Sequence, residues 1–187
     1  MGYTFDENRA LKADDGGYIS TGGIYVGHIS EMVAFNLDSG AGGVELSFES
    51  IGGERCSFVT VYTKNKNGSE NFAKGKIDSM IGILGLSEVP HVKNGEKITF
   101  PSVCNKPIAF ALQREDYIKQ DQTIGWKMNL LHFFYADTLQ TFKERKENKP
   151  ASVSKREIKD ALINTESKQT SNAAKAFVLQ DNDDLPF

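Results

Sequence analysis

Residues 58–76 combine aromatic side chains with cations in a pattern that suits contact with nucleic acid. The segment has three aromatic residues and four lysines, and Glu70 is its only acid, so its net charge is +3. Proteins that bind single strands combine a cationic groove with aromatic platforms, and each stacked base contributes about 1–3 kcal/mol. The pattern predicts seven contact residues: Phe58, Tyr62, Lys64, Lys66, Phe72, Lys74 and Lys76.

A second group of cations and aromatic residues lies around the connection into the last expected strand. It contains Trp126, the only tryptophan of the chain. The group predicts further nucleic-acid contacts from Arg114, Lys119, Trp126 and Lys127, with Tyr117 beside them. Both groups have a structural alternative. Phe58, Tyr62 and Trp126 can belong to the core, and the four lysines of residues 58–76 can simply be solvated.

Phosphate-loop and metal chemistry are not indicated. A Walker loop needs four residues between its glycines and Ser or Thr after its lysine. Here six residues separate Gly68 from Gly75, and Ile77 stands in the Ser/Thr position. No metal-ligand spacing links the histidines and cysteines: His28, His91, His132, Cys56 and Cys104. With no clear nucleophile or carboxylate cluster, the sequence predicts a protein that is not an enzyme and that uses no metal or cofactor.

Hydrophobic periodicity indicates the elements that must position these residues. Apolar and polar residues alternate in strand-like runs, with a change of phase near Ser30 that suggests a bulge. The runs lie at 23–37, 44–49, 56–63, 97–100, 108–113 and 126–135. Between the third and fourth runs the period becomes helical. Ile77, Met80, Ile81 and Leu84 share one face, which predicts a short helix near 76–85 that Gly85 ends.

Three strands, one helix and then two or three strands is the element order of an OB-fold, a five-stranded Greek-key barrel. In that fold, strands two and three and their hairpin face the ligand. Residues 58–76 are therefore expected at the binding face, and the second group is expected in a loop that closes over DNA. The predicted fold class is mainly β: a five-stranded OB-fold Greek-key barrel with one short helix, followed by a partly helical or disordered C-terminal tail.

The chain divides into four parts: a flexible arm over 1–17, an OB-fold domain over 18–142, a tether with short helical segments over 143–180, and an acidic tip over 181–187. Two helix signals mark the start of the tether. Asp137 can cap a helix that runs to about Asn148. Ser154 and Glu157 have the spacing of a capping box.

The charge distribution does not favour nucleic-acid binding. The formal net charge is −3, and residues 1–142 hold 13 Lys/Arg against 17 Asp/Glu. Residues 143–180 hold nine Lys/Arg against five Asp/Glu. Any affinity for DNA must therefore come from a local basic surface with stacking aromatic residues.

The last seven residues place three carboxylates beside an apolar end. An apolar pocket, a cation for the terminal carboxylate and a basic rim on another protein would capture such a peptide. The expected partner-binding residues are Asp181, Asp183, Asp184, Leu185, Pro186 and Phe187. This ending resembles the acidic tip of bacterial and phage single-stranded DNA-binding proteins, in which the tip recruits replication, recombination and repair proteins.

A barrel-like body followed by a tether is similar to the layout of that family, and residues 18–29 look more like its phage-encoded members. The resemblance implies a sequence-tolerant single-stranded DNA-binding protein that protects exposed strands and recruits host or phage proteins through its tip. Two cysteines make no disulfide framework and the N-terminus has no apolar signal core, so we expect a cytoplasmic setting in a bacterium or a phage-infected cell. No apolar run approaches the length of a membrane span, so no membrane partner is expected. A homo-oligomer is possible, but the resemblance does not predict one. The alternative is a protein-interaction adaptor with the same barrel and no DNA affinity, which the acidic body favours.

Overall fold

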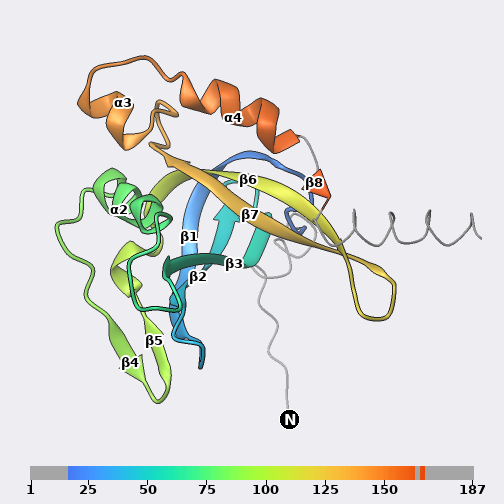
Figure 1. Ribbon diagram of the computed structural model, residues 1–187. Coiled ribbons are helices and arrows are strands. Elements are labelled where there is room, and N and C mark those ends of the chain that lie inside the picture. The colour runs from blue at the N-terminus through green and yellow to red at the C-terminus, as the bar shows by residue number, and fades with distance from the viewer. Residues whose placement is uncertain (1–16, 163–164, 167–187) are drawn as a thin grey trace, which may run out of the picture.

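The computed structural model describes residues 17–162 and 165–166, and this part of the chain is mainly β (Figure 1). Seven strands pair in antiparallel fashion, and one short strand, β8, pairs in parallel with β6. The strands are β1 (Gly23–Asn36), β2 (Gly42–Ser50), β3 (Arg55–Lys64), β4 (Val92–Asn94), β5 (Lys97–Thr99), β6 (Pro107–Ile118), β7 (Ile124–Phe134) and β8 (Thr165–Glu166). The helices are α2 (Lys74–Ile83), α3 (Phe142–Lys146) and α4 (Val153–Leu162), with a 3-10 turn, η1 (Pro101–Val103).

The long strand β1 organises the sheet. It pairs with β2 on one side, and on the other side with β6 along its first half and β5 along its second half. The bulge expected near Ser30 is confirmed, because the β1–β2 register shifts between Ile29 and Glu31. The bulge allows Ile29 and Met32, three residues apart, both to face the core, where they are 0% and 3% exposed.

Five strands are long, and they pair in the order β3-β2-β1-β6-β7. The additional strands are β8 and the short β4–β5 hairpin, of which the sequence predicted only the β5 half. β3 and β7, the two ends of the long-strand order, lie in contact with each other. Within the described residues, no hydrogen-bonded ladder joins these two ends.

The core lies between the long strands and α2. Alternation along β2 buries Val44, Leu46 and Phe48, and the Phe48 ring stacks on Phe110 at a centroid distance of 4.3 Å. Ile77 and Met80 close the core from α2. The predicted helix is confirmed with a start two residues earlier, and Gly85 follows it with a φ of +67°, as an end signal requires.

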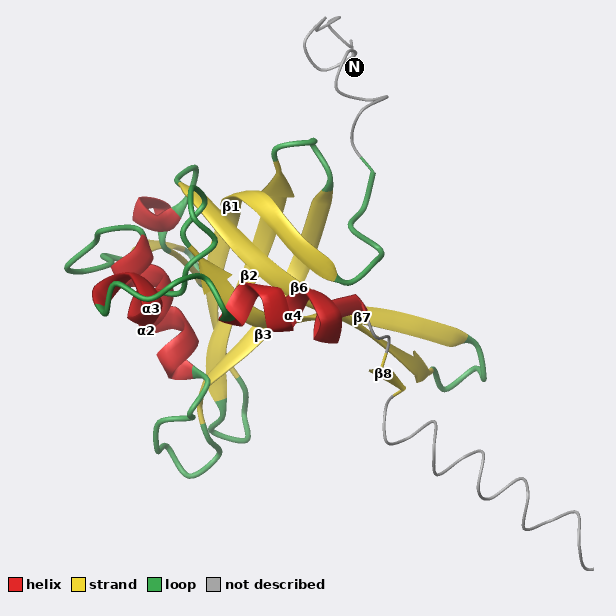
Figure 2. Cartoon of the chain, turned by 90° about the horizontal axis from the view of Figure 1, so that it is seen from above, coloured by secondary structure: helices red, strands yellow, loops and turns green. Residues whose placement is uncertain are grey.

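The helix α4 lies across the outer face of β1, β6 and β7 (Figure 2). Under it lie Ala109, Ala111 and Phe134, all 0% exposed, and Val153 of α4 packs against this group. The two alanines are small, which lets the helix approach the sheet closely. The structure describes two of the helical segments expected near and after residue 142, namely α3 and α4. α3 packs against α2, and α4 packs against β1, β6 and β7.

The helix caps predicted at Asp137 and Ser154 are wrong. Thr141 caps α3 in a capping box with Glu144, while Asp137 pairs with Arg145 at 3.0 Å. α4 begins at Val153, so Ser154 lies inside its first turn and is buried. Residue spacing alone made Asp137 and Ser154 plausible caps. At the start of α4, however, the carboxylate of Glu144 from α3 accepts the hydrogen bonds of the Ser152 and Val153 N–H groups.

Candidate nucleic-acid interface

A pocket of about 310 Å³ opens between β3, the loop after it, α2 and β7. It brings together three of the seven contact residues predicted in 58–76. Its lining consists of Thr60, Val61, Tyr62, Asn71, Phe72, Ala73, Lys76, Asn129 and Leu130. The sequence pattern did not single out Asn71 and Asn129. Their signal was weak: Asn71 precedes an aromatic residue, and Asn129 is a polar position within a strand-like run.

Residues 58–76 form most of β3, the β3–α2 loop and the first residues of α2. The turn between β2 and β3 lies at 51–54, outside this segment. The turn signal near Asn65 is real, because Gly68 has a φ of +83° and its N–H donates to the Asn65 carbonyl at 2.9 Å.

Two aromatic rings at the pocket face solvent. Phe72 is 90% exposed, although its loop is held by hydrogen bonds: Asn71 donates to the Asn65 side chain at 2.8 Å and accepts from the Ala73 N–H at 3.0 Å. Tyr62 is 45% exposed and meets the Phe35 ring edge-on at 5.4 Å. An ordered loop and a neighbouring ring thus hold both aromatic groups at the surface, where they can stack with a planar ligand.

Phe58 is also outside the core, which rules out its structural alternative. It is 74% exposed and lies on the outward face of β3 with Thr60 and Tyr62. The register between β3 and β2 shifts in this region, between Leu46 and Phe48, and Phe58 has a φ of +61°. A bulky residue in this left-handed region is uncommon and strained, and such outliers concentrate at functional sites.

The four lysines of 58–76 differ in availability. Lys64 and Lys66 are exposed, and neither forms an ion pair within the described part of the chain. Lys74 pairs with Asp78 at 3.2 Å and Glu70 at 3.5 Å, and its hydrogen bond to Asp78 is the main cause of its raised pKa.

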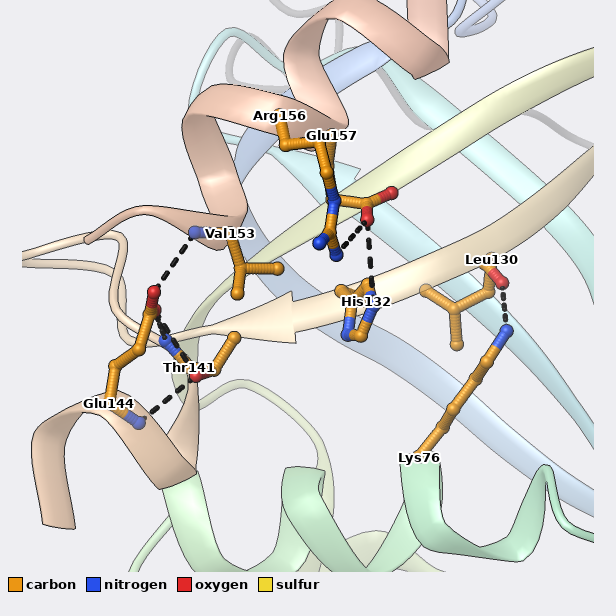
Figure 3. Close-up of polar contacts among 8 residues, drawn as sticks. All are labelled: Lys76, Leu130, His132, Thr141, Glu144, Val153, Arg156 and Glu157. Atoms are coloured by element: carbon orange, nitrogen blue, oxygen red, sulfur yellow. Dashed lines mark hydrogen bonds and ion pairs between the residues drawn. The ribbon is translucent and has the colours of Figure 1, made fainter. Parts of the chain in front are cut away.

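Lys76 is held by the wall of the pocket. Its Nζ donates to the Leu130 carbonyl at 2.7 Å (Figure 3). Burial lowers the pKa of this ammonium group, and the charge of Glu157 opposes that shift. Lys76 thus ties α2 to β7 across the pocket. The exposed lysines near the aromatic rings that form no ion pair among the described residues are Lys64 and Lys66.

The second predicted group lies on the β6–β7 hairpin, and none of its residues lines the pocket. Arg114 pairs with Asp116 at 2.7 Å, and its guanidinium carbon lies 5.2 Å from the centroid of the Trp126 ring. Lys127 pairs with Glu115 at 3.3 Å, directly opposite it in the strand register. Lys119 is exposed near the turn of the hairpin.

Trp126 is 40% exposed and belongs to neither of the two core clusters, so its structural alternative as a core residue is wrong. Its ring packs with Arg114 instead. Acids also adjoin the first group: Glu45 lies opposite Thr60 in the β2–β3 ladder. The electrostatic field near both groups is therefore mixed in sign.

The predicted partner-binding residues Asp181, Asp183, Asp184, Leu185, Pro186 and Phe187 lie outside the described residues, and so does most of the N-terminal arm. Within the described ranges, no cluster of three or more His, Cys, Asp or Glu side chains could hold a metal ion. None of the helices described is both long and apolar enough to span a membrane. Comparisons with models of known families and with curated proteins found no match to this chain.

Proposed function

We propose that this protein binds single-stranded DNA without strong sequence preference and has no catalytic activity. The observation that carries the proposal is the pocket at β3, α2 and β7, with the exposed rings of Tyr62 and Phe72 on its lining. Stacking on aromatic rings tolerates any sequence, because every base has a π-face. Lys64 and Lys66 provide cations for phosphate groups next to these rings.

The proposal includes an OB-type barrel. It is supported by the strand order β3-β2-β1-β6-β7, by contact between β3 and β7, and by the position of α2 between β3 and β6 in the chain. The β4–β5 hairpin is then an insertion after the helix. In this arrangement the pocket lies against the third strand, in keeping with a ligand face on strands two and three.

The proposal assigns the C-terminal tip a separate role. Phe187 would anchor the peptide in an apolar pocket of a partner protein, and the three aspartates would speed encounter with a basic rim. Exposed strands in replication, recombination and repair, in the cytoplasm of a bacterium or an infected cell, would then be both coated and marked for partner proteins.

A protein-interaction adaptor without DNA affinity is the second candidate. The pairing of Lys74, Arg114 and Lys127 with neighbouring acids favours it, because paired cations release fewer counterions from DNA. In that case the aromatic pocket would take an apolar peptide side chain. The two candidates differ in salt dependence, since phosphate contacts weaken steeply with salt and an apolar contact does not.

Fluorescence anisotropy of a labelled oligo-dT at two salt concentrations tests the proposal. The unaltered protein should bind, and less tightly at high salt. Phe72→Ala should weaken binding by about 1–3 kcal/mol. Tyr18→Ala is a matched control, because Tyr18 is 77% exposed and does not line the pocket. Absence of binding, or equal loss in both variants, would reject the DNA site at the pocket.

A further inference from the structure

A second basic region lies on α3 and the start of α4, outside both predicted contact groups. Residues 143–156 contain six Lys/Arg and two Glu. We use the name helical basic surface for Lys143, Lys146 and Lys155, which are exposed and form no ion pair among the described residues. Lys143 and Lys146 are three positions apart on α3 and therefore share one face of that helix.

Both glutamates in this region have partners within the protein. Glu144 is 6% exposed, and its carboxylate accepts hydrogen bonds from the backbone N–H groups of Thr141 and Val153, each at 2.9 Å (Figure 3). Burial alone would raise the pKa of Glu144, but hydrogen bonds from Thr141, Ser152 and Val153 outweigh burial and lower it to about 2. Glu147 pairs with Lys149 at 2.6 Å.

Glu144 therefore has two structural roles and forms no ion pair with Lys143, Lys146 or Lys155. Its carboxylate closes the capping box of α3, and it also occupies the N-terminus of α4. These bonds fix the two short helices relative to each other. The lysines around Glu144 consequently lie on an ordered surface, so less side-chain and backbone entropy is lost on binding than in a flexible tail.

This surface adjoins the two elements that form the pocket walls. On β7, His132 lies two positions after the pocket residue Leu130, and the β6–β7 register shifts between these two residues. His132 Nε2 is 3.6 Å from Glu157 of α4, and Arg156 pairs with the same carboxylate at 3.1 Å (Figure 3).

The helix α2 makes the second connection. Its contact with α3 is close at Gly82, where a Cβ atom would come within 2.6 Å of the Phe142 ring. Lys76, near the start of α2, lines the pocket, while Phe142 is the first residue of α3. Both α2 and β7 thus run from the pocket to the helical basic surface.

We propose that the helical basic surface is a second site for phosphate groups of a single nucleic-acid strand, continuous with the pocket. Bases would stack at Tyr62 and Phe72, and the strand would leave the pocket along β7 toward Lys155 and then Lys143 and Lys146. This inference rests on the proposed function and extends its footprint. It assigns DNA binding to residues beyond the barrel, which the sequence had placed in a tether.

The test compares oligo-dT of two lengths, one of about 6 nucleotides that fills the pocket and one of about 30 that can reach the helices. The triple variant Lys143→Ala, Lys146→Ala, Lys155→Ala should bind the short oligonucleotide normally. For the long one, its salt slope should fall by about 2, because each phosphate contact on a single strand contributes about 0.7. The three side chains are exposed, and a thermal melt checks that the variant is folded.

The control is the triple variant Lys93→Ala, Lys97→Ala, Lys106→Ala, which changes net charge equally on and near the β4–β5 hairpin, although Lys97 pairs with Glu31. Its salt slope should stay closer to that of the unaltered protein. An unchanged slope in the first variant, or equal losses in both, would overturn the inference while leaving the pocket intact. If the unaltered protein binds neither oligonucleotide, the proposed function itself fails.

Discussion

The pocket on β3, α2 and β7 and the hairpin of β6 and β7 look alike in sequence but differ in structure. Each combines aromatic residues with lysine or arginine. At the pocket, Tyr62 and Phe72 are exposed and two neighbouring lysines form no ion pair among the described residues. On the hairpin, Arg114 lies over Trp126, and Glu115 neutralises Lys127 across the strands. Strand register and side-chain packing therefore decide whether a cluster of basic and aromatic residues is available to a ligand.

The largest expected effect on DNA affinity comes from removing aromatic rings from each region. Tyr62→Ala and Phe72→Ala should each weaken oligo-dT binding by about 1–3 kcal/mol, because each loses one stacked base. Trp126→Ala should have a smaller effect, since Arg114 already packs against that ring. Anisotropy titrations of the three variants measure the difference. A loss at Trp126 as large as at Phe72 would move the main binding face to the hairpin.

Phe58 separates backbone strain from ring stacking on the same strand face. Both Phe58→Ala and Phe58→Gly remove the ring, so their DNA affinities should fall equally if the ring contacts a base. Phe58→Gly should be the more stable variant by about 1 kcal/mol, because a Cβ atom is unfavourable at a φ of +61°. Denaturant unfolding measures this difference. Equal stabilities would mean that the backbone at position 58 relaxes to an ordinary strand conformation in the alanine variant.

The salt dependence of DNA binding distinguishes the lysines near the pocket from Lys127 on the hairpin. Lys64→Ala combined with Lys66→Ala should reduce the salt slope of binding by about 1.4, which corresponds to two phosphate contacts on a single strand. Lys127→Ala should reduce the slope by less than the roughly 0.7 of one phosphate contact, because that ammonium lies 3.3 Å from Glu115. Titrations at several salt concentrations give each slope. A larger change for Lys127 would show that its pair opens to receive DNA.

The smallest expected effect is a pH response at His132 and the neighbouring helix α4. Burial is the main cause of the lowered pKa of His132, and the surrounding charges are Glu157 and Arg156 on α4, Lys76 on α2 and Glu144 on α3. Because the unfolded histidine binds a proton more readily, the stability from neutral His132 is complete above about pH 6.5 and is lost as pH falls through the lower folded pKa.

Hydrogen exchange can localise this response. On acidification from about pH 7.5 to about pH 5.5, the amides of α4 should lose protection, corrected for intrinsic exchange rates, while those of the β6–β7 hairpin should change less. His132→Gln is the control variant and should remove the α4 response. Persistence of the response in this variant would assign it to other carboxylates.

Local patterns in the sequence predicted much of the fold and part of the candidate site. Alternation along β2 and the four apolar positions of α2 depend on repeats of two and 3.6 residues, which neighbouring residues define by themselves. Those repeats gave the mainly β class, the helix after β3 and the bulge in β1. They also put Phe58, Thr60 and Tyr62 on one face of β3, but only the structure shows that this face points outward. Composition was sufficient to single out Phe72 and its neighbouring lysines.

Tertiary structure decided which of these groups are free and what completes the site. Lys76 donates to Leu130, 54 residues away, and Asn129 reaches the pocket from β7. Glu144, which the sequence places in a tether, fixes α4 from the preceding helix. These contacts depend on strand register and on helix packing, which bring together residues far apart in the chain. A local repeat of two or 3.6 residues does not encode contacts of this kind.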